Sequence, residues 1–344
     1  MDEVQLATLY VVTEGAYLHK DGQAIVIDVE RVTTGRVPLH MVDYIACFGR
    51  VMVSPSLMEY CAEQQIPVNF MTEQGRLMAR VDAPASGNVQ LRRKQFRLAD
   101  DPAFCLAVSK CIVAGKIQNA RQTLLRSGRD IADTAVGDRL RRCADLLAQN
   151  LDAVAVASTL DSLRGQEGDA ARLYFEHFAL MTPDVPEPLR FSGRTRRPPL
   201  DPVNSLLSFF YSILAHDCTA GLVAAGLDPS VGFFHEDRPG RPSLALDLME
   251  EFRAPLVDRF VITLINRRQV SPDDFETRPG GAVFMTDAAR KRVITAFQQR
   301  KMERRIHPHL QQESPLGRFP SLQAKILARH VRGDLLHYVP AIFK

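Results

Sequence analysis

The chain has 344 residues, 46% of them hydrophobic, so it can bury more than one hydrophobic core and two domains are expected. Its formal net charge of +3 is too small to indicate a nucleic-acid-binding protein by itself, so that question depends on where the basic residues cluster. The sequence contains no run of about 18 apolar residues, which a membrane-spanning helix would need, and its N-terminus lacks the features of an export signal. We therefore expect a cytoplasmic protein without membrane contact.

The first eighty or so residues are expected to form mostly β-strands. Residues 7–12 and 24–28 are rich in β-branched and apolar side chains, and the tripeptide at 20–22, Lys-Asp-Gly, is typical of a β-hairpin. The pattern then predicts a short helix and two further strands, at 54–64, 66–71 and 77–81. A small β-rich domain over residues 1–82 is therefore expected.

A linker is expected at residues 83–90, because the sequence there is small and polar with Pro and Gly. Residues 91–344 carry apolar residues at three- and four-residue spacing, which is typical of helices. The predicted helices, about seven in number, span 91–126, 130–150, 152–180, 203–225, 243–267, 284–305 and 317–335. The fold class is therefore predicted to be α+β, with a small N-terminal β-rich domain followed by a larger all-helical domain.

Glu167 is the first candidate for a functional residue. It lies between two glycines, and residues 167, 170, 171 and 174 share one helical face, so small alanines leave room beside the carboxylate. The alternative is an ordinary helix start, in which Gly165 serves as the cap and Glu167 favours the positive end of the helix dipole. This segment alone does not decide between the two interpretations.

A second acidic group and a histidine follow. Asp247, Glu250 and Glu251 lie at i, i+3 and i+4 of an apolar helical pattern, so Asp247 is close to both glutamates. Clustered carboxylates in an apolar setting need a cation, although pairing with Arg253, Arg259 or solvent is the alternative. His235 lies where an apolar segment opens into a charged loop, a common location for ligands, yet a lone histidine more often has a structural role.

An imidazole with two or more carboxylates is a donor set that suits Mg²⁺ or Mn²⁺, and the imidazole favours Mn²⁺. The six cysteines form no C-x-x-C pair, so neither a zinc ribbon nor a thioredoxin-like site is supported, and reduced core thiols are expected. A bound Mg²⁺ or Mn²⁺ ion can polarise a phosphoryl oxygen and activate water or a 3′-hydroxyl. The candidate metal site therefore indicates phosphate chemistry.

Basic residues cluster at 92–97, 194–197 and 300–305, in the same portion of the chain as the candidate metal ligands. Each cluster alone is usually a solvated face, but together they favour a phosphodiester backbone as the substrate. The candidate DNA contacts are Arg92, Arg93, Lys94, Arg97, Arg194, Arg196, Arg197, Arg241, Arg304 and Arg305.

Taken in order, these segments resemble the CRISPR-associated integrase family, the metal-dependent nuclease subunit of the spacer-acquisition complex. The resemblance is carried by the segments 13–22, 49–54, 165–172, 196–204, 226–235 and 243–253. Each of these motifs is modest by itself, and together they are specific.

The resemblance implies that Glu167, His235 and Glu250 hold the metal, with Asp247 in the same acidic motif as a further catalytic candidate. Helical geometry alone does not separate Glu250 from Glu251, and Glu250 is chosen from the family pattern, in which some relatives have Asp. The implied reaction is a transesterification in which the 3′-hydroxyl of a captured DNA fragment attacks a phosphodiester at the first repeat of a CRISPR array. A homodimer formed by the N-terminal domain and a small partner subunit that bridges two dimers are also implied.

Two other interpretations stay open at this point. The same residues could serve a structure-selective DNA nuclease in repair, with water as the nucleophile. Alternatively, the chain could be a non-catalytic DNA-binding scaffold whose acids pair with Arg238, Arg241 and Arg253.

Overall fold

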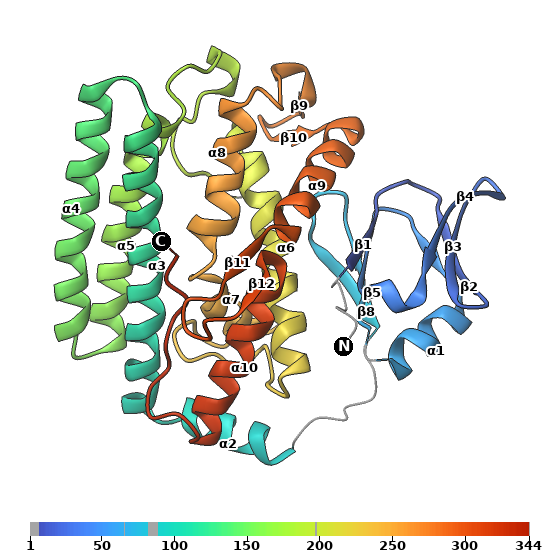
Figure 1. The fold of residues 1–344 in the computed structure, drawn as a ribbon, viewed down its shortest axis with the longest axis horizontal. Helices are drawn as coiled ribbons and strands as arrows, with labels where there is room; N and C mark the ends of the chain where they lie inside the picture. Colours follow the sequence, from blue (N-terminus) through green and yellow to red (C-terminus); the bar gives the residue numbers. More distant parts are fainter. Residues whose placement is uncertain (1–6, 65, 82–88, 197, 344) are drawn as a thin grey trace. The chain divides into compact units, whose positions relative to one another are not determined.

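The computed structural model describes residues 7–64, 66–81, 89–196 and 198–343 (Figure 1). Contacts between Cα atoms divide the chain into two compact units, Met1–Gly87 with Arg290–Gln299, and Asn88–Ala289 with Arg300–Lys344. Most of the predicted linker, 83–90, lies outside the described residues, and its last two residues already belong to a helix.

The first unit contains two four-stranded sheets, with the strand orders β1-β5-β7-β8 and β4-β3-β2-β6. Its elements are β1 (Ala7–Val11), β2 (Tyr17–Asp21), β3 (Ala24–Val29), β4 (Val32–Pro38), β5 (Val42–Phe48), β6 (Met52–Val53), α1 (Pro55–Glu63), β7 (Val68–Met71) and β8 (Leu77–Val81). Strands β1, β5 and β7 are parallel, whereas β8 is antiparallel to β7. In the other sheet β2, β3 and β4 are antiparallel, and β6 is parallel to β2.

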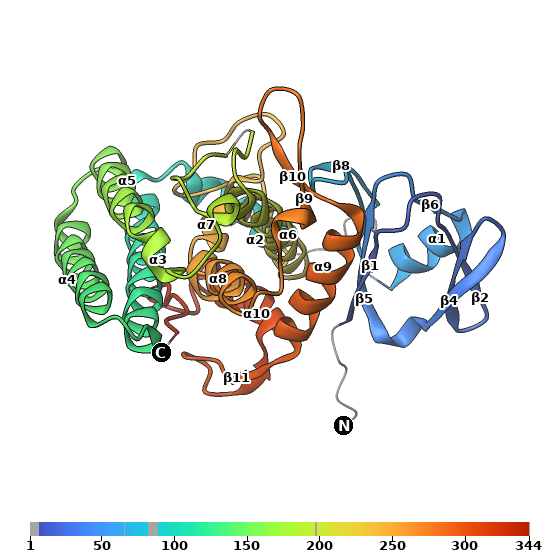
Figure 2. The same ribbon diagram turned by 90° about the horizontal axis from the view of Figure 1, so that it is seen from above.

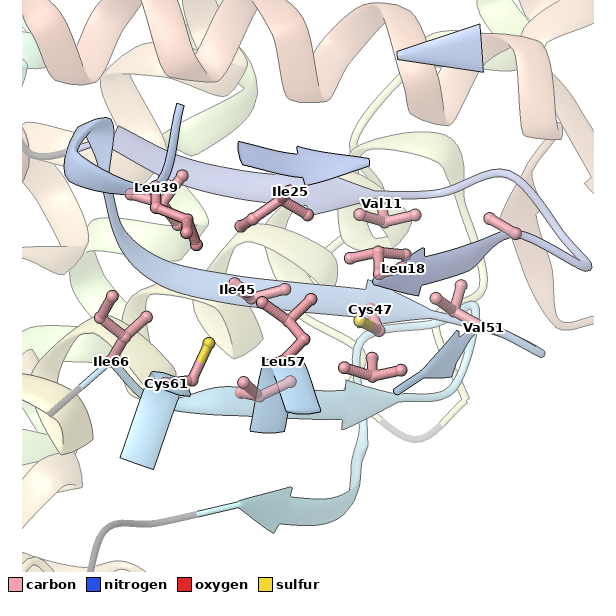
Figure 3. Close-up of a cluster of buried hydrophobic side chains, with 14 residues drawn as sticks. Val11, Leu18, Ile25, Leu39, Ile45, Cys47, Val51, Leu57, Cys61 and Ile66 are labelled. Carbon is pink, nitrogen blue, oxygen red and sulfur yellow. The ribbon is translucent and has the colours of Figure 1, made fainter. Parts of the chain in front are cut away.

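Both sheets and α1 contribute side chains to one hydrophobic core (Figure 3). Leu18 and Ile25 come from one sheet, Ile45 from the other, and Leu57 and Cys61 from the helix, and all five are fully buried. Burial raises the pKa of the Cys61 thiol to about 11. All six cysteines of the chain are free, so no disulfide contributes to this fold.

The predicted hairpin near Gly22 is confirmed, but one of its strands was missed. The turn joins β2 to β3, with Asp21 opposite Ala24, whereas the predicted strand at 7–12 pairs in parallel with β5 of the other sheet. The sequence of β2, Tyr-Leu-His-Lys-Asp, has too few apolar residues to show a strand pattern. A two-residue turn nevertheless pairs the segments directly beside it in the chain.

The second unit is mainly helical, which confirms the predicted order of a strand-rich region followed by a helical one. Its helices are α2 (Val89–Ala99), α3 (Pro102–Asp130), α4 (Thr134–Val156), α5 (Leu160–Glu176), α6 (Pro202–Ala224), α7 (Ser243–Met249), α8 (Arg259–Asn266) and α10 (Phe319–Arg332). Helix α9 (Asp287–Met302) begins and ends in this unit, and its residues 290–299 cluster with the first unit.

Two short hairpins in the helical unit were not predicted. They are formed by β9 (Phe275–Thr277) with β10 (Val283–Met285), and by β11 (Arg304–Ile306) with β12 (Glu313–Pro315). The predicted helix at 284–305 extended into β10 and β11, because three-residue strands are too short to display a period of two. The expectation of an all-helical domain is therefore wrong for these segments.

Three of the predicted helices are interrupted. The segment 152–180 contains the end of α4 and all of α5, with residues 157–159 between them outside any helix. In the other two, a proline contributes to the break. The segment 91–126 divides into α2 and α3, because Asp101 caps α3 by accepting the backbone N–H of Ala103 at 2.9 Å, with Pro102 as the first helical residue. The segment 243–267 divides into α7, a π-helical turn (Arg253–Asp258) and α8. Pro255 in that turn has no N–H to continue an α-helical ladder.

Helix α6 is the one helix among the described residues that is long and apolar enough to cross a membrane, by length and composition only. In the 18-residue stretch that meets this test, 61% is buried inside the structure, as in the core helix of a soluble protein. Figure 2 shows α6 among α7, α8 and α10, which it contacts. Helices α3, α4 and α5 pack side by side in the same unit (Figure 1).

Candidate metal centre

Glu167 lies well inside α5, not at its start. The helix begins after Thr159, whose side chain accepts the backbone N–H of Ser162 at 3.1 Å. The interpretation of Glu167 as part of a helix start capped by Gly165 is therefore wrong. A Cβ atom at Gly165 or Gly168 would meet no described atom within 4 Å, although a glycine inside a helix costs about 1 kcal/mol relative to alanine. Internal packing does not require these glycines, and they leave the surface of α5 bare beside Glu167.

Asp247 organises the loop that carries His235. Its carboxylate is fully buried at the centre of α7 and accepts the backbone N–H groups of Phe233, Phe234 and His235 at 2.7, 3.0 and 2.9 Å. It also lies 2.7 Å from the imidazole Nδ1 of His235. Because a carboxylate that receives these groups acts as the acceptor, Nδ1 donates and Nε2 is left free to act as a ligand.

The close passage of this loop over α7 depends on Gly232. A Cβ atom there would lie 2.8 Å from the backbone oxygen of His235, 2.8 Å from Cβ of Ser243 and 3.1 Å from Oδ2 of Asp247. Real Cβ atoms essentially never approach another atom to less than 3.0 Å, and the first two of these distances are below that limit. Glycine at this position therefore lets the loop reach the Asp247 carboxylate, and through it fixes the imidazole of His235.

Glu250 lies at the end of α7 and is only 4% exposed. Its Oε1 lies 3.9 Å from Nε2 of His235, and its Oε2 lies 2.9 Å from Nε of Arg253 and 2.8 Å from Nζ of Lys116. Burial opposes ionisation of this carboxyl, but the positive charges of Arg253 and Lys116, with His235, outweigh it and lower the pKa of Glu250 to about 2.

Arg253 is itself held by a buried polar group behind the site. Its guanidinium lies 4.7 Å from the ring centroid of Tyr211, whose hydroxyl donates to Asp258 Oδ1 at 2.5 Å. Tyr174, which shares a helical face with Glu167 as predicted, donates to Asp258 Oδ2 at 3.0 Å. Burial raises the pKa of Asp258 to about 6, despite these hydrogen bonds. Two tyrosines and a carboxylate thus orient the arginine that accompanies Glu250.

Glu251, adjacent to Glu250, has a different environment. It is fully buried, accepts the backbone N–H of Ala341 at 2.7 Å and the amide of Gln323 at 3.0 Å, and receives the hydroxyl of Tyr338. These partners leave it pointing away from His235 and toward the C-terminal segment. The structure thus separates the two glutamates that helical periodicity could not, because Glu250 lies beside His235 and Glu251 does not.

Lys116 is the residue of this site that the sequence analysis missed. Its ammonium group forms ion pairs with Glu167 Oε1 and Glu250 Oε2, and so connects α5 to the turn after α7. A signal was present, since Lys116 is the single charged residue between Lys110 and Arg121 and lies in the apolar stretch that forms the buried middle of α3. A lysine in such a setting needs a carboxylate partner.

Glu167 and Glu250 thus meet at one cation, which is the ammonium group of Lys116, and Nε2 of His235 lies beside the other oxygen of Glu250. Among the described residues, no group of three or more His, Cys, Asp or Glu side chains is arranged to hold a metal ion. Oε2 of Glu250 is buried and, although two cations are within ion-pair distance, it has no hydrogen-bond donor of correct geometry in the described part of the chain. Two carboxylates around a cation, with an imidazole nitrogen beside them, fit a hard divalent ion.

The basic candidates lie in different surroundings. On α2, Arg93, Lys94 and Arg97 are exposed, and Lys94 also donates to the backbone oxygen of Arg332 at 2.7 Å, while Arg92 is half-buried. Arg196 is exposed, Arg241 is half-buried, and Arg197 lies outside the described residues.

Three further basic candidates are engaged with the protein itself. Arg194 is directed into the fold, where it donates to Asn204 Oδ1 at 2.7 Å and lies over the ring of Tyr211. Arg304 and Arg305 are exposed and pair with Glu313 and Glu303 at 3.2 and 3.4 Å. The exposed arginines and lysine of α2, with Arg196, are therefore the members most accessible to a phosphodiester backbone.

The sequence matches the family model described as CRISPR associated protein Cas1 over residues 9–299. It is 49% identical, over 98% of this chain and 99% of the relative, to a protein of Rhodospirillum rubrum named CRISPR-associated endonuclease Cas1 2. It is 45% identical, over 98% of this chain and 99% of the relative, to CRISPR-associated endonuclease Cas1 1 of Chlorobaculum tepidum.

Solved structures are similar over the whole chain. A Cas1 protein from Thermotoga maritima has a TM-score of 0.81 at 24% identity, covering 97% of this chain and 98% of that one, and has the same fold. A chain of a Cas6-RT-Cas1–Cas2 complex has a TM-score of 0.81 at 28% identity over 100% of this chain, which spans 37% of that longer chain.

Proposed function

Because this chain belongs to the Cas1 family of CRISPR-associated proteins, as its sequence resemblance predicted, we propose that it is a metal-dependent DNA integrase that inserts captured DNA fragments into a CRISPR array. Its curated relatives are named endonucleases, and the integrase chemistry is our extension of that activity. The observation that carries the proposal is the meeting of Glu167 and Glu250, from separate elements, at one cation position, with Nε2 of His235 3.9 Å from Oε1 of Glu250.

We assign Glu167, Glu250 and Nε2 of His235 as ligands of Mg²⁺ or Mn²⁺. When bound, such an ion supplies Lewis-acid polarisation of a phosphoryl oxygen and favours deprotonation of the attacking hydroxyl. Asp247 fixes the imidazole with Nδ1 protonated, so that Nε2 is available as a ligand. Arg253 keeps Glu250 ionised and oriented, and is itself held by Tyr211.

In the proposed transesterification, the oxygen of a DNA 3′-hydroxyl forms a bond to phosphorus and loses its proton. The bond from phosphorus to the 3′-oxygen of the repeat strand breaks, and that oxygen gains a proton. The number of phosphodiester bonds is unchanged, so no energy-rich cofactor is needed. The open surface beside Gly165 and Gly168 gives a backbone access to Glu167, and the exposed basic residues of α2 supply charge complementary to phosphate.

We also propose that the chain forms dimers and binds a partner protein. A similar chain was solved in a complex of Cas1 with Cas2, and we propose that this chain likewise binds a small partner subunit that bridges two dimers. Dimerisation is assigned to the strand-rich unit, where Val32, Met41, Met52 and Met78 are exposed apolar side chains that fit an interface. We place the protein in the cytoplasm, which accords with its free cysteines.

A strand-transfer assay tests the proposed reaction. The assay contains the protein, the partner subunit, a DNA fragment with free 3′-hydroxyl ends and a repeat-containing target. Joined products are expected when Mn²⁺ or Mg²⁺ is present. A chelator is expected to reduce joining at least about a hundredfold, since loss of a catalytic ion costs several kcal/mol. Cut ends without joined product would instead indicate the structure-selective nuclease. No metal-dependent product at all, with DNA binding retained, would indicate the scaffold.

Asp247→Asn tests the assigned orientation of His235. An asparagine amide cannot accept the three backbone N–H groups and the imidazole as the carboxylate does, so Mn²⁺ affinity in isothermal titration calorimetry is expected to fall about 10- to 100-fold. The matched control is Asp237→Asn in the same loop, which affects one contact, the 3.2 Å bond from the backbone N–H of Gly232. Equal effects of the two variants would contradict the role given to Asp247.

A further inference from the structure

Lys116 occupies the position between the two carboxylates to which we assign the metal. Its Nζ pairs with Oε1 of Glu167 and lies 2.8 Å from Oε2 of Glu250, although the three residues come from α3, from α5 and from the turn after α7. A lysine ammonium is a compact point charge on a flexible four-carbon stem, and it can replace a small cation without the fixed geometry of a guanidinium. The metal-free protein therefore has its own cation at this place.

The backbone that carries Lys116 is fixed against its neighbours. A Cβ atom at Gly115 would lie 2.7 Å from Cβ of Pro340 and 3.4 Å from Cγ of Glu251, so α3 is in close contact with the C-terminal segment there. One turn later, the amide of Asn119 donates to the backbone oxygens of Glu251 and Ala341 at 2.8 and 2.7 Å. Helix α3 is thus tied to the residue next to Glu250 and cannot move away without breaking these contacts.

The side chain of Lys116, in contrast, can move. It is 18% exposed, and the neighbouring Glu167 side chain is 24% exposed, so the ion pair lies at the edge of the solvent. The stem of a lysine can rotate its ammonium group toward water without any change in α3. Displacement of this group therefore requires only a rotamer change, whereas Glu250, 4% exposed, stays in place.

The charges explain why a cation is needed between Glu167 and Glu250, and why an ammonium group and a metal ion cannot share that position. Glu167 and Glu250 both contact the same ammonium group, so without it their like charges would repel at short range in a partly buried setting. Arg253 pairs with Glu250, which leaves Lys116 as the link between the two carboxylates. A divalent ion placed between the same carboxylates would face the ammonium charge at a few ångströms, and one of the two cations would have to leave.

We propose that Lys116 is a positioning residue that holds Glu167 and Glu250 together in the metal-free protein and is exchanged for the divalent ion when the metal binds. This inference rests on the proposed function, because it assumes that the ion binds to these two carboxylates. The exchange preserves the arrangement of α3, α5 and the turn after α7 in both states. It also weakens metal binding, because each ion must displace an ion pair.

The test uses the full-length chain stripped of metal, with Lys116→Met, which keeps a long apolar stem and removes the charge. The metal-free variant is expected to unfold roughly 5 °C below the wild type, as a chain of this size does when an ion pair in a partly buried site is lost. Its Mn²⁺ affinity in calorimetry is expected to rise about tenfold, because no ammonium group has to be displaced. Added Mn²⁺ should therefore raise its melting temperature more than that of the wild type.

Lys110→Met is the matched control. Lys110 lies on the same helix and donates to the backbone oxygen of Ala155 at 2.8 Å, so its replacement removes the same charge without affecting a carboxylate of the site. Its Mn²⁺ affinity is expected to stay within about twofold of the wild type, since the exposed charge is screened by salt. An equal rise in both variants would show a general charge effect and overturn the proposal.

Two further results of the Mn²⁺ titrations would overturn the proposed role of Lys116. Mn²⁺ affinity of Lys116→Met that equals or falls below that of the wild type would overturn the exchange while leaving the metal site intact. If the wild type itself binds no Mn²⁺, the proposed metal site fails and the inference with it, a result visible without any variant. Should Lys116→Met not fold by circular dichroism, Lys116→Gln is titrated in its place, because its neutral amide can still donate to a carboxylate, and the same rise in affinity is expected.

Discussion

Glu167→Gln is expected to reduce metal-dependent strand joining by about 10³-fold, which corresponds to about 4 kcal/mol of transition-state stabilisation. A glutamine amide has one neutral oxygen where the carboxylate has two charged ones, so it is a poor ligand for Mg²⁺ or Mn²⁺. It also weakens the contact with Lys116, which brings α3 and α5 together at the site. DNA binding, measured by fluorescence anisotropy, is expected to stay within about twofold of the wild type, because we assign the phosphate contacts to basic residues elsewhere.

Glu176→Gln is the matched control for this variant. Glu176 is the last residue of the same helix, is exposed and pairs with Arg172 at 2.9 Å, four residues earlier. Exposed pairs of this kind contribute about 0.5 kcal/mol, so joining and stability should both remain close to the wild type. Normal joining by Glu167→Gln would show that this carboxylate is not part of the catalytic centre.

Glu251→Ala is expected to lower the free energy of unfolding by about 3 kcal/mol in urea denaturation of the full chain. The substitution leaves a cavity and removes the acceptor of the Tyr338 hydroxyl, the Gln323 amide and the Ala341 N–H, all within the buried contact of the C-terminal segment. Glu187→Ala, at an exposed residue paired with Arg190, is the control and should change stability by less than about 0.5 kcal/mol. A loss below about 1 kcal/mol for Glu251→Ala would mean that this segment does not depend on the buried carboxyl.

The same carboxyl gives stability a pH dependence. Burial raises the pKa of Glu251 from 4.5 to about 7, against the hydrogen bonds from Tyr338, Ala341 and Gln323. Because the folded-state pKa is raised, the folded chain holds the proton more tightly, so the contribution is fully present below pH 4.5 and is lost as the pH rises through 7. Glu251→Gln cannot titrate here, so the stability of the wild type relative to this variant should fall by roughly 2–3 kcal/mol between pH 5 and pH 8. A constant difference across that range would contradict the raised pKa.

Regular local patterns were predicted well. The helices of the second unit follow apolar residues at three- and four-residue spacing, and the predicted strand at 77–81 coincides with β8. Errors arose where a tertiary contact or a single proline outweighed the pattern. The break at Pro102, the π-helical turn around Pro255 and the three-residue strands of two hairpins are examples.

The sequence by itself determined which residue types were available for the proposed metal site and, through the family resemblance, which of them to propose as ligands. Glu167, His235 and Glu250 could be named because their motifs are local, each a short run of residues on one helix face or loop. The same runs also specified that the chain belongs to a strand-rich and helical fold of the Cas1 type.

Only the tertiary structure assigned roles within those motifs. The carboxylate of Asp247 accepts backbone N–H groups and orients His235. Glu250 faces the cation, whereas Glu251 accepts hydrogen bonds from the C-terminal segment. These three acids have different roles although they lie within one and a half turns of helix. Lys116 could not be placed at the site from sequence, because its two partners are remote along the chain. Local periodicity encodes which face a side chain occupies, whereas the element that packs against that face, and hence the charge it meets, is decided only when the chain folds.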